Sequence, residues 1–234
     1  IAGLSAEPRS LSPKWFYDAR GSELFEAITE LPEYYPTRQE AALLREQASE
    51  LAALIPEGAV LVEFGSGASE KTRILLDATR DRLAAYVAVD ISPSALDGAA
   101  ERLAAAYPEL KVLPVVGDFL HLDRLPAETP PGARVGFFPG STIGNLERDE
   151  SVAFLADARR LLGEGAEFLL GVDLVKDEAT LLAAYDDTAG ITAAFNRNVL
   201  ERARSDLGAR VDPIAFKHSA VWNAAESRIE MHLT

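Results

Sequence analysis

Cysteine is absent from this 234-residue sequence, and histidine occurs only three times. A chain without cysteine has no disulfide bonds, no thiolate nucleophile and no cysteine-ligated metal site. The three histidines, His121, His218 and His232, do not pair with one another at a spacing that binds metal. We therefore expect no metal site, and we expect the histidines to have structural roles.

Long apolar runs and an excess of positive charge are missing as well. No run approaches the roughly 18 to 20 residues of a membrane helix, and residues 1–16 lack the apolar stretch of a signal peptide. The 23 basic residues are outnumbered by 37 acidic ones, which gives a net charge of −14. Nucleic acids and anionic membranes attract clustered cations, so this balance argues against both as partners. We expect a soluble, cytoplasmic monomer whose partner is a small molecule.

Short apolar runs alternate with helical patterns through the middle of the chain. Predicted strands cover residues 59–65, 85–90, 111–118, 134–139 and 167–173, and predicted helices cover 72–83, 93–107 and 150–162. This alternation is typical of an α/β fold in which helices cover both faces of a parallel sheet. Pro114 fits poorly in a central strand, because proline has no N–H to donate.

The two ends of the chain break this alternation. An N-terminal segment contains the aromatic run Trp15–Tyr17, of which we expect Trp15 and Phe16 to lie in the core. After residue 175, helical patterns at 178–186 and 192–207 precede a predicted hairpin of strands 216–222 and 228–233. We predict a domain of residues 1–175, which contains the N-terminal segment and the sheet, and a smaller α+β domain of residues 176–234.

A glycine-rich turn follows the first predicted strand, at Gly65 and Gly67. Such a turn can be purely structural, but it also allows close approach of a ligand to the backbone. A dinucleotide fingerprint would place a third glycine where Glu70 stands, and a carboxylate there would repel a pyrophosphate. The Gly-Lys-Ser/Thr ending of a phosphate-binding P-loop is also missing. A ligand with an amino-acid moiety, a ribose and an adenine fits better.

Acidic residues end the next two predicted strands. Asp90 can accept both hydroxyls of a ribose, and Asp118 can accept from an adenine amine while Phe119 packs on the ring. Each acid could instead be only a helix cap. Three consecutive strands with these endings nevertheless have the spacing of S-adenosylmethionine (SAM) enzymes of the Rossmann-like methyltransferase class.

The sequence resembles the bacterial L-histidine Nα-methyltransferases of ergothioneine biosynthesis along almost its whole length. The matching stretches are residues 14–18, 21–25, 31–38, 63–73, 140–146, 171–177, 184–187, 192–199 and 228–231. The resemblance implies a class I SAM-dependent methyltransferase with a smaller substrate-binding domain. It also implies trimethylation of the α-amine of free L-histidine, which gives hercynine and S-adenosylhomocysteine.

The resemblance also implies a role for individual residues. The catalytic residues would be Tyr17, Gly140 and Asn145; the substrate would be bound by Tyr34, Phe25, Asn145, Tyr185 and Met231; the cofactor would be bound by Gly65, Gly67, Lys71, Asp90, Asp118 and Phe119. Asn145 and Tyr185 would hold the substrate carboxylate, and Tyr34 would face the imidazole. A glutamate and a serine that help to recognise the imidazole would follow the end of the given sequence, as would the closing strands of the sheet.

The α-amine must lose a proton before it can attack a methyl group, yet no strong base stands among the matching residues. A phenol ordinarily ionises near pH 10, so Tyr17 would act at most as an acceptor or as a relay to water. We favour capture of the neutral fraction of the amine. The rings of Tyr17, Phe25 and Tyr34 could then attract the quaternary ammonium of the product.

Three alternatives to histidine methylation remain at this point. A related N-methyltransferase could act on another amino acid, such as a tryptophan derivative. A non-catalytic SAM-binding domain would keep Gly65, Asp90 and Asp118 but would not need Asn145 together with Tyr185. A dehydrogenase is the most distant of the three.

Overall fold

The computed structural model describes residues 2–67 and 70–234, so Ala68 and Ser69 of the glycine-rich turn lie outside the described residues. The chain divides into two compact units. We name residues 38–173 the sheet unit, and residues 1–37 together with 174–234 the hairpin unit. This grouping differs from the predicted domains of residues 1–175 and 176–234. The physical reason is that aromatic residues of the N-terminal segment pack into the core of the hairpin unit.

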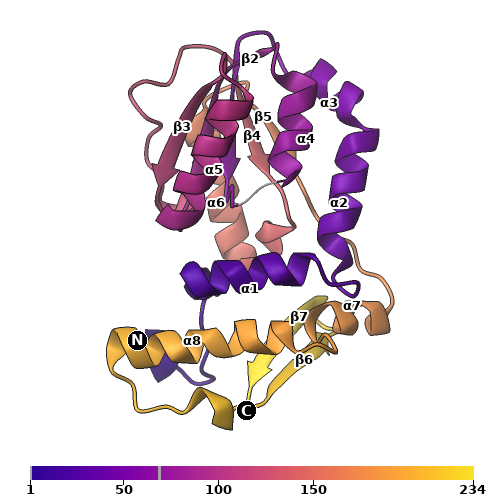
Figure 1. Ribbon diagram of the computed structural model, residues 1–234, viewed down its shortest axis with the longest axis vertical. Helices are drawn as coiled ribbons and strands as arrows, with labels where there is room; N and C mark the ends of the chain where they lie inside the picture. Colours follow the sequence, from indigo (N-terminus) through magenta and orange to yellow (C-terminus); the bar gives the residue numbers. More distant parts are fainter. Residues whose placement is uncertain (1, 68–69) are drawn as a thin grey trace. The chain divides into compact units, whose positions relative to one another are not determined.

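The sheet unit is built on five parallel strands in the order β3-β2-β1-β4-β5 (Figure 1). The strands are β1 Ala59–Phe64, β2 Leu83–Asp90, β3 Lys111–Val116, β4 Arg134–Phe138 and β5 Glu167–Leu170. The strand order reverses between β1 and β4, and the carboxyl ends of strands at such a switch point form the usual ligand-binding crevice of an open α/β sheet. β3 is an edge strand, which explains how it accommodates Pro114.

Helices cover both faces of this sheet. One face packs against α2 Tyr35–Glu46, α3 Ala48–Leu54, α4 Glu70–Thr79 and α5 Pro93–Ala106; the other packs against α6 Arg148–Leu162. Neighbouring residues of β1 alternate between the faces, with Leu61 in the first core and Val62 in the second. The helix predicted over 72–83 ends at Thr79, because Leu83 is buried as the first residue of β2.

A buried carboxyl group ties β1 to its neighbours. Glu63 is fully buried and accepts hydrogen bonds from the Thr72 hydroxyl at 2.7 and 2.9 Å and from the Tyr86 hydroxyl at 2.6 Å. Burial raises the pKa of the Glu63 carboxyl to about 7, although the hydrogen bonds from Tyr86 and Thr72 lower it. Burial and the neighbouring carboxyl also raise the pKa of Tyr86 well above its ordinary value. β1, α4 and β2 are therefore joined beneath the glycine-rich turn.

The hairpin unit packs helices against a two-stranded antiparallel sheet. Its elements are α1 Ala19–Thr29, α7 Glu178–Tyr185, α8 Ile191–Leu207, β6 His218–Asn223 and β7 Arg228–Leu233, with the short 3₁₀ helices Ala2–Ser5, Pro13–Phe16 and Pro213–Ala215. α8 runs alongside α1 (Figure 1). In the part of the chain that the structure describes, no helix has the length and apolar character needed to cross a membrane.

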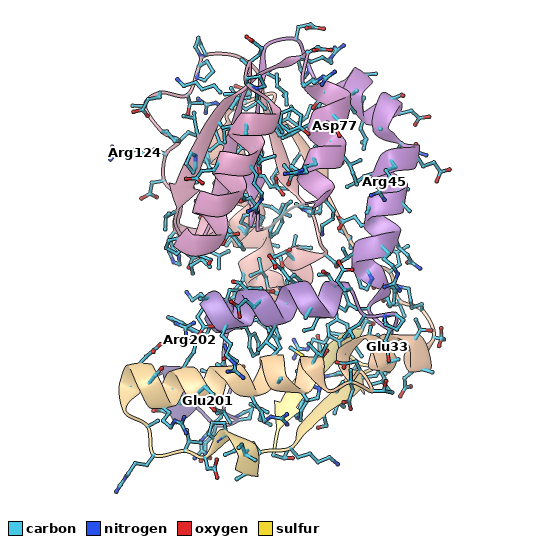
Figure 2. The ribbon with its side chains drawn as sticks, in the orientation of Figure 1. Glu33, Arg45, Asp77, Arg124, Glu201 and Arg202 are labelled. Carbon is cyan, nitrogen blue, oxygen red and sulfur yellow. The ribbon has the colours of Figure 1, made fainter. Side chains whose placement is uncertain are left out.

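The N-terminal aromatic run divides between core and surface. Phe16 is buried and stacks on Phe195 with 4.8 Å between ring centroids, as predicted for a core residue. The prediction for Trp15 is wrong, because 46% of this residue is exposed. Its ring instead contacts the cationic groups of Lys14 and Arg202 at 5.3 and 5.7 Å. Arg202 projects from α8 (Figure 2). It also donates to the Trp15 carbonyl.

The raised pKa of Glu63 predicts a pH-dependent effect of Glu63→Gln. Because the folded-state pKa of about 7 exceeds the ordinary 4.5, the folded state binds the extra proton between these pH values. Wild-type stability should therefore fall as pH rises through this window, and the glutamine variant should lack this loss. Relative to wild type, its free energy of unfolding should rise by up to about 3 kcal/mol between pH 5 and pH 8.

Urea unfolding at several pH values measures this difference. Glu46→Gln is the matched control, because it removes a carboxyl group that is exposed on α2. A pH-independent difference for Glu63→Gln would show that the buried carboxyl does not titrate in this window.

Candidate active site

The glycine-rich turn after β1 leaves open space beside the backbone. Gly65 and Gly67 have φ values of +74° and +47°, which glycine adopts without strain. Among the described residues, a Cβ atom at Gly67 would meet no atom within 4 Å, and one at Gly65 would meet only Cε1 of Phe119, at 3.8 Å. A ligand can therefore approach this turn closely.

Asp90 at the end of β2 fastens the turn to the neighbouring strand. Its Oδ2 accepts from the Gly67 N–H at 2.8 Å, and its Oδ1 accepts from the Ser92 N–H at 2.8 Å. Each carboxylate oxygen keeps a second lone pair with which it can accept from a ligand hydroxyl. The structure thus brings together two of the predicted cofactor residues, Asp90 and Gly67.

Asp118 and Phe119 follow β3 and have structural contacts of their own. Asp118 caps the 3₁₀ helix Phe119–His121 by accepting from the Leu120 N–H at 3.0 Å, and its Oδ2 lies 3.2 Å from Nδ1 of His121. Phe119 packs edge-on against the rings of Phe138 and Phe154. The cap considered as an alternative for Asp118 is therefore present, and Phe119 reaches from the core to the side of Gly65.

Two exposed apolar side chains at the same edge were not predicted. Ile91, directly after Asp90, is 37% exposed, and Val116 at the end of β3 is 56% exposed. The sequence could have indicated Ile91 and Val116, because each is an apolar residue one or two positions from an acid at the end of a predicted strand. Together they give the edge an apolar surface beside its carboxylates.

A cluster of Lys71, Glu40 and Gly140 lies at the switch point between β1 and β4. The Lys71 ammonium donates to Oε2 of Glu40 at 2.8 Å. The Gly140 N–H is shared by Oε1 and Oε2 of Glu40, at 2.9 and 2.8 Å. Lys71 and Gly140 were predicted site residues, whereas Glu40 was missed because its partners are 31 and 100 residues away in the sequence.

Asn145 ends the 3₁₀ helix Thr142–Asn145, and the residue is exposed. The turn that carries this helix is held from both sides. The Thr142 hydroxyl donates to the Pro139 carbonyl at 2.8 Å, and the Asp173 N–H donates to the Ser141 hydroxyl at 3.0 Å. The predicted substrate-binding amide is thus carried on a turn directly after β4.

Aromatic rings in the hairpin unit form one connected group. Tyr17 contacts Phe25, Phe25 contacts Tyr34, and Tyr34 contacts Tyr185, with ring centroids 5.6, 6.2 and 6.0 Å apart and the rings edge-on. Phe195 of α8, which was not predicted, lies 5.8 Å from Tyr17 and 6.0 Å from Phe25. The structure therefore joins three predicted substrate-binding residues, Phe25, Tyr34 and Tyr185, to the predicted catalytic residue Tyr17. Met231, also predicted to bind the substrate, packs partly buried against the same core.

His218 contacts this group through the backbone of Tyr185. Its Nε2 lies 2.9 Å from the Tyr185 carbonyl, and its Nδ1 lies 2.9 Å from the side-chain amide nitrogen of Asn196. These partners require a proton on Nε2 and a lone pair on Nδ1, so the hydrogen-bond network assigns the tautomer. This buried contact agrees with the structural role predicted for His218.

The predicted residues divide between the two units. Those predicted to bind the cofactor all lie in the sheet unit, together with Gly140 and Asn145. Those that form the aromatic group, Tyr17, Phe25, Tyr34 and Tyr185, lie in the hairpin unit, as does Met231.

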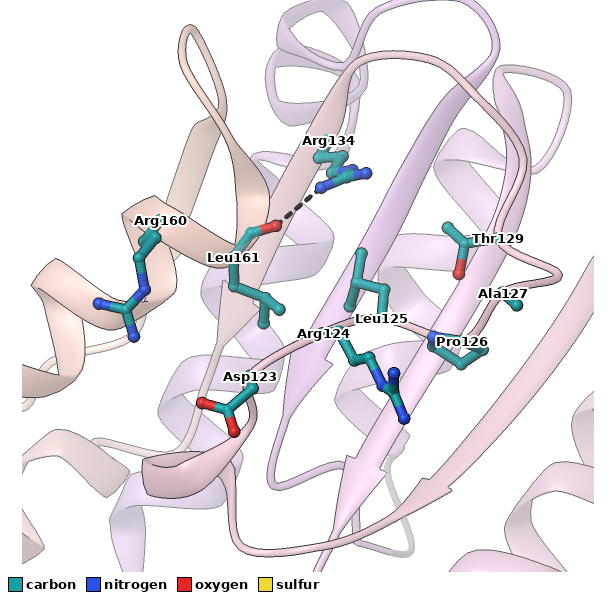
Figure 3. Close-up of a pocket in the computed structure, with 9 residues that line it drawn as sticks. All are labelled: Asp123, Arg124, Leu125, Pro126, Ala127, Thr129, Arg134, Arg160 and Leu161. Carbon is teal, nitrogen blue, oxygen red and sulfur yellow. Dashed lines mark hydrogen bonds between the residues drawn. The ribbon is translucent and has the colours of Figure 1, made fainter.

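A hollow of about 410 Å³ lies elsewhere on the sheet unit (Figure 3). It is lined by Asp123, Arg124, Leu125, Pro126, Ala127, Thr129, Arg134, Arg160 and Leu161. Arg134 is the first residue of β4, and its guanidinium donates to the Leu161 carbonyl at 2.7 Å. The hollow therefore lies toward the amino end of this strand and contains none of the predicted site residues.

Comparisons with known proteins place the whole chain in one family. Residues 1–234 match the family described as histidine-specific, SAM-dependent methyltransferases. Histidine N-alpha-methyltransferase of Mycolicibacterium smegmatis is 51% identical over 235 residues, which cover 99% of this chain and 72% of that protein. Ergothioneine biosynthesis protein 1 of Neurospora crassa is 36% identical over 205 residues, which cover 86% of this chain and 23% of that protein.

A solved structure confirms the predicted fold class. A proposed SAM-dependent methyltransferase of Methanococcus maripaludis matches 95% of this chain and 94% of its own, with a TM-score of 0.50 and 16% sequence identity. Its fold is the Rossmann-like fold predicted from the alternating strands and helices. The resemblance noted in the sequence is confirmed as well, and the chain belongs to the family of histidine-specific, SAM-dependent methyltransferases.

Proposed function

We propose that this protein transfers three methyl groups from SAM to the α-amine of free L-histidine and so forms hercynine for ergothioneine biosynthesis. Its family is defined by SAM-dependent methylation of histidine. The observation that carries the proposal is the arrangement of residues at the carboxyl edge of the sheet. There Asp90 accepts a hydrogen bond from Gly67 of the glycine-rich turn, and Lys71 lies beside Gly140. We further propose that the active form is a monomer in the cytoplasm.

The side chains at this edge fit the parts of SAM. Asp90 would accept the ribose hydroxyls, and Asp118 the adenine amine. Phe119, Ile91 and Val116 would supply apolar contacts to the adenine. Lys71 would pair with the carboxylate of the methionine moiety, and the open space beside Gly65 and Gly67 would allow close approach to the backbone. Bound there, SAM supplies a methyl group on a sulfonium, which a lone pair on nitrogen can attack.

The substrate would be held by groups that suit an amino acid. The amide of Asn145 and the phenol of Tyr185 can both donate to a carboxylate, and neither adds a negative charge that would repel it. Tyr34 would face the imidazole, and Met231 would line the pocket beside it. Positioning of two bound reactants can lower a barrier by as much as about 7 to 11 kcal/mol.

The reacting amine would be surrounded by Tyr17, Phe25 and the carbonyl of Gly140. The carbonyl can accept from an N–H of the amine and so direct the lone pair toward the methyl group. The edge-on contact of Tyr17 with Phe25 supports an aromatic surface that tolerates added methyl groups. Such faces attract a quaternary ammonium by about 0.5 to 2 kcal/mol each. We propose that these residues capture the neutral amine, without a dedicated base.

A substrate panel tests this function. The protein is incubated with SAM and single amino acids, including histidine and tryptophan derivatives, and the products are analysed by mass spectrometry. We expect histidine to gain three methyl groups, with one S-adenosylhomocysteine formed per methyl group. Methylation of a tryptophan derivative but not histidine would identify a related enzyme of different selectivity. SAM binding without any turnover would identify a non-catalytic domain.

Asp90→Ala should weaken SAM binding by at least about tenfold, because charge-assisted hydrogen bonds to Gly67 and Ser92 are lost together with the ribose acceptor. Isothermal titration calorimetry with SAM measures the change. Asp81→Ala is the control, since the Asp81 side chain is 95% exposed. Equal affinities of the Asp90 variant and wild type would remove Asp90 from the site.

Tyr17→Phe should keep at least about one tenth of wild-type kcat, because the ring remains and a phenol is a poor base at neutral pH. The pH profile of kcat should keep its shape in this variant. Measurement from pH 6 to pH 10 decides the point. Loss of turnover at every pH with intact histidine binding would show that the Tyr17 hydroxyl is needed for proton transfer.

A further inference from the structure

We propose that Glu40 is a positioning residue for methyl transfer, which fixes the backbone of Gly140 and the ammonium of Lys71 through a single carboxylate. The inference rests on the proposed function, in which the Gly140 carbonyl faces the reacting amine and Lys71 holds SAM. Glu40 itself lies on α2 and acts only through these two neighbours.

The contacts of Glu40 are those of a fixed group and not of a surface side chain. Its carboxylate accepts from the Gly140 N–H with both oxygens, at 2.9 and 2.8 Å, and from Lys71 at 2.8 Å. Only 17% of the Glu40 side chain and 18% of the Lys71 side chain are exposed. A charge-assisted hydrogen bond that is shielded from water in this way is about twice as strong as a neutral one.

The backbone that Glu40 holds is unusual. Gly140 has φ = +80° and Ser141 has φ = +53°, so two consecutive residues adopt a left-handed conformation. For serine this conformation is unfavourable, and such a residue persists only where its surroundings hold it in place. The Thr142 hydroxyl closes the turn onto the Pro139 carbonyl, and the Asp173 N–H donates to the Ser141 hydroxyl. Glu40 holds the beginning of the turn, at the residue whose carbonyl is proposed to meet the amine.

Gly171 provides a second and independent observation. A Cβ atom at Gly171 would fall 2.0 Å from Oε1 of Glu40 and 3.2 Å from Cα of Pro139. Gly171 is not among the glycines with positive φ, so its backbone conformation is open to other residues. The contact with Glu40 therefore explains why a glycine stands at this position. The turn after β4 and the residue after β5 together form a cradle for this carboxylate.

Removal of the Glu40 carboxylate should lower the rate of methyl transfer more than it weakens the binding of histidine. A misplacement of about 1 Å at a reacting centre can cost about a hundredfold in rate. With Gly140 released, its carbonyl no longer points in one direction, and productive alignment of the amine becomes rare. Contacts to the imidazole and carboxylate of histidine do not involve Glu40, so the KM for histidine should change little.

Steady-state kinetics of two substitutions separate the two contacts of Glu40. Glu40→Ala should lower kcat by about 10- to 100-fold, with the KM for histidine within about threefold of wild type. Glu40→Gln keeps an acceptor for the Gly140 N–H but loses the negative charge that holds the Lys71 ammonium in place. Its kcat should stay within about fivefold of wild type, while its KM for SAM rises several-fold. Glu46→Ala, on the exposed face of the same helix, should behave as wild type.

Gly171→Ala tests the same cradle without changing Glu40. The added methyl group should displace the carboxylate and lower kcat as Glu40→Ala does. In the double variant the alanine at 171 should add little further loss, because the clashing oxygen is gone. Thermal unfolding verifies that each variant is folded. If Glu40→Ala does not fold, Gly171→Ala decides alone, and a wild-type kcat in that variant overturns the proposal.

The outcomes distinguish this inference from the proposed function. Absence of histidine methylation by the wild-type enzyme would contradict the function itself. An active wild type with an equally active Glu40→Ala would contradict only the role of Glu40. Equal losses of kcat in Glu40→Ala and Glu40→Gln would also overturn it, because a neutral acceptor at this position should still hold Gly140.

Discussion

Hydrogen bonds to three acidic side chains near the carboxyl edge of the sheet are the interactions on which the proposed cofactor site depends. Asp90 holds Gly67, Glu40 holds Gly140, and Glu63 holds the Thr72 hydroxyl at the start of α4. Loop N–H groups beside a ligand site need acceptors. Here side chains supply them, so the backbone is fixed independently of any ligand. Some of the many acidic residues therefore hold the backbone in place, in addition to the negative charge that such residues give the surface.

The hairpin unit is organised by a different force. Its aromatic group is held by apolar burial and edge-on ring contacts, in which Phe195 touches both Tyr17 and Phe25. Only a few polar contacts direct it, such as the hydrogen bond of His218 to the Tyr185 carbonyl. Under the proposed function, the two units would separate two tasks. Directional hydrogen bonds would shape the edge proposed for SAM, and apolar faces would suit an amine that grows with each methylation.

Local signals were sufficient to predict the sheet. The strands lie within a few residues of their predicted limits, and the contact of Asp90 with Gly67 could be anticipated because each ends or follows an apolar run. Glu40 could not be found in this way, because its contact with Gly140 spans 100 residues and no periodic pattern marks it. The grouping of the N-terminal segment with the hairpin unit leaves no local signal for the same reason, since Phe16 meets Phe195 from the far end of the chain. Tertiary contacts between distant segments leave no local pattern.

The glycines at the ligand edge show why residue type alone does not reveal function. At Gly67 no described neighbour lies within 4 Å of where a Cβ atom would stand, which agrees with the close ligand approach proposed there. At Gly140 the conformation requires it, and at Gly171 the carboxylate of Glu40 takes the place of a side chain. In the sequence these positions look alike, although an alanine would be opposed by the backbone conformation at Gly67 and Gly140 and by another side chain at Gly171. The clash at Gly171 is the one that leads to Glu40.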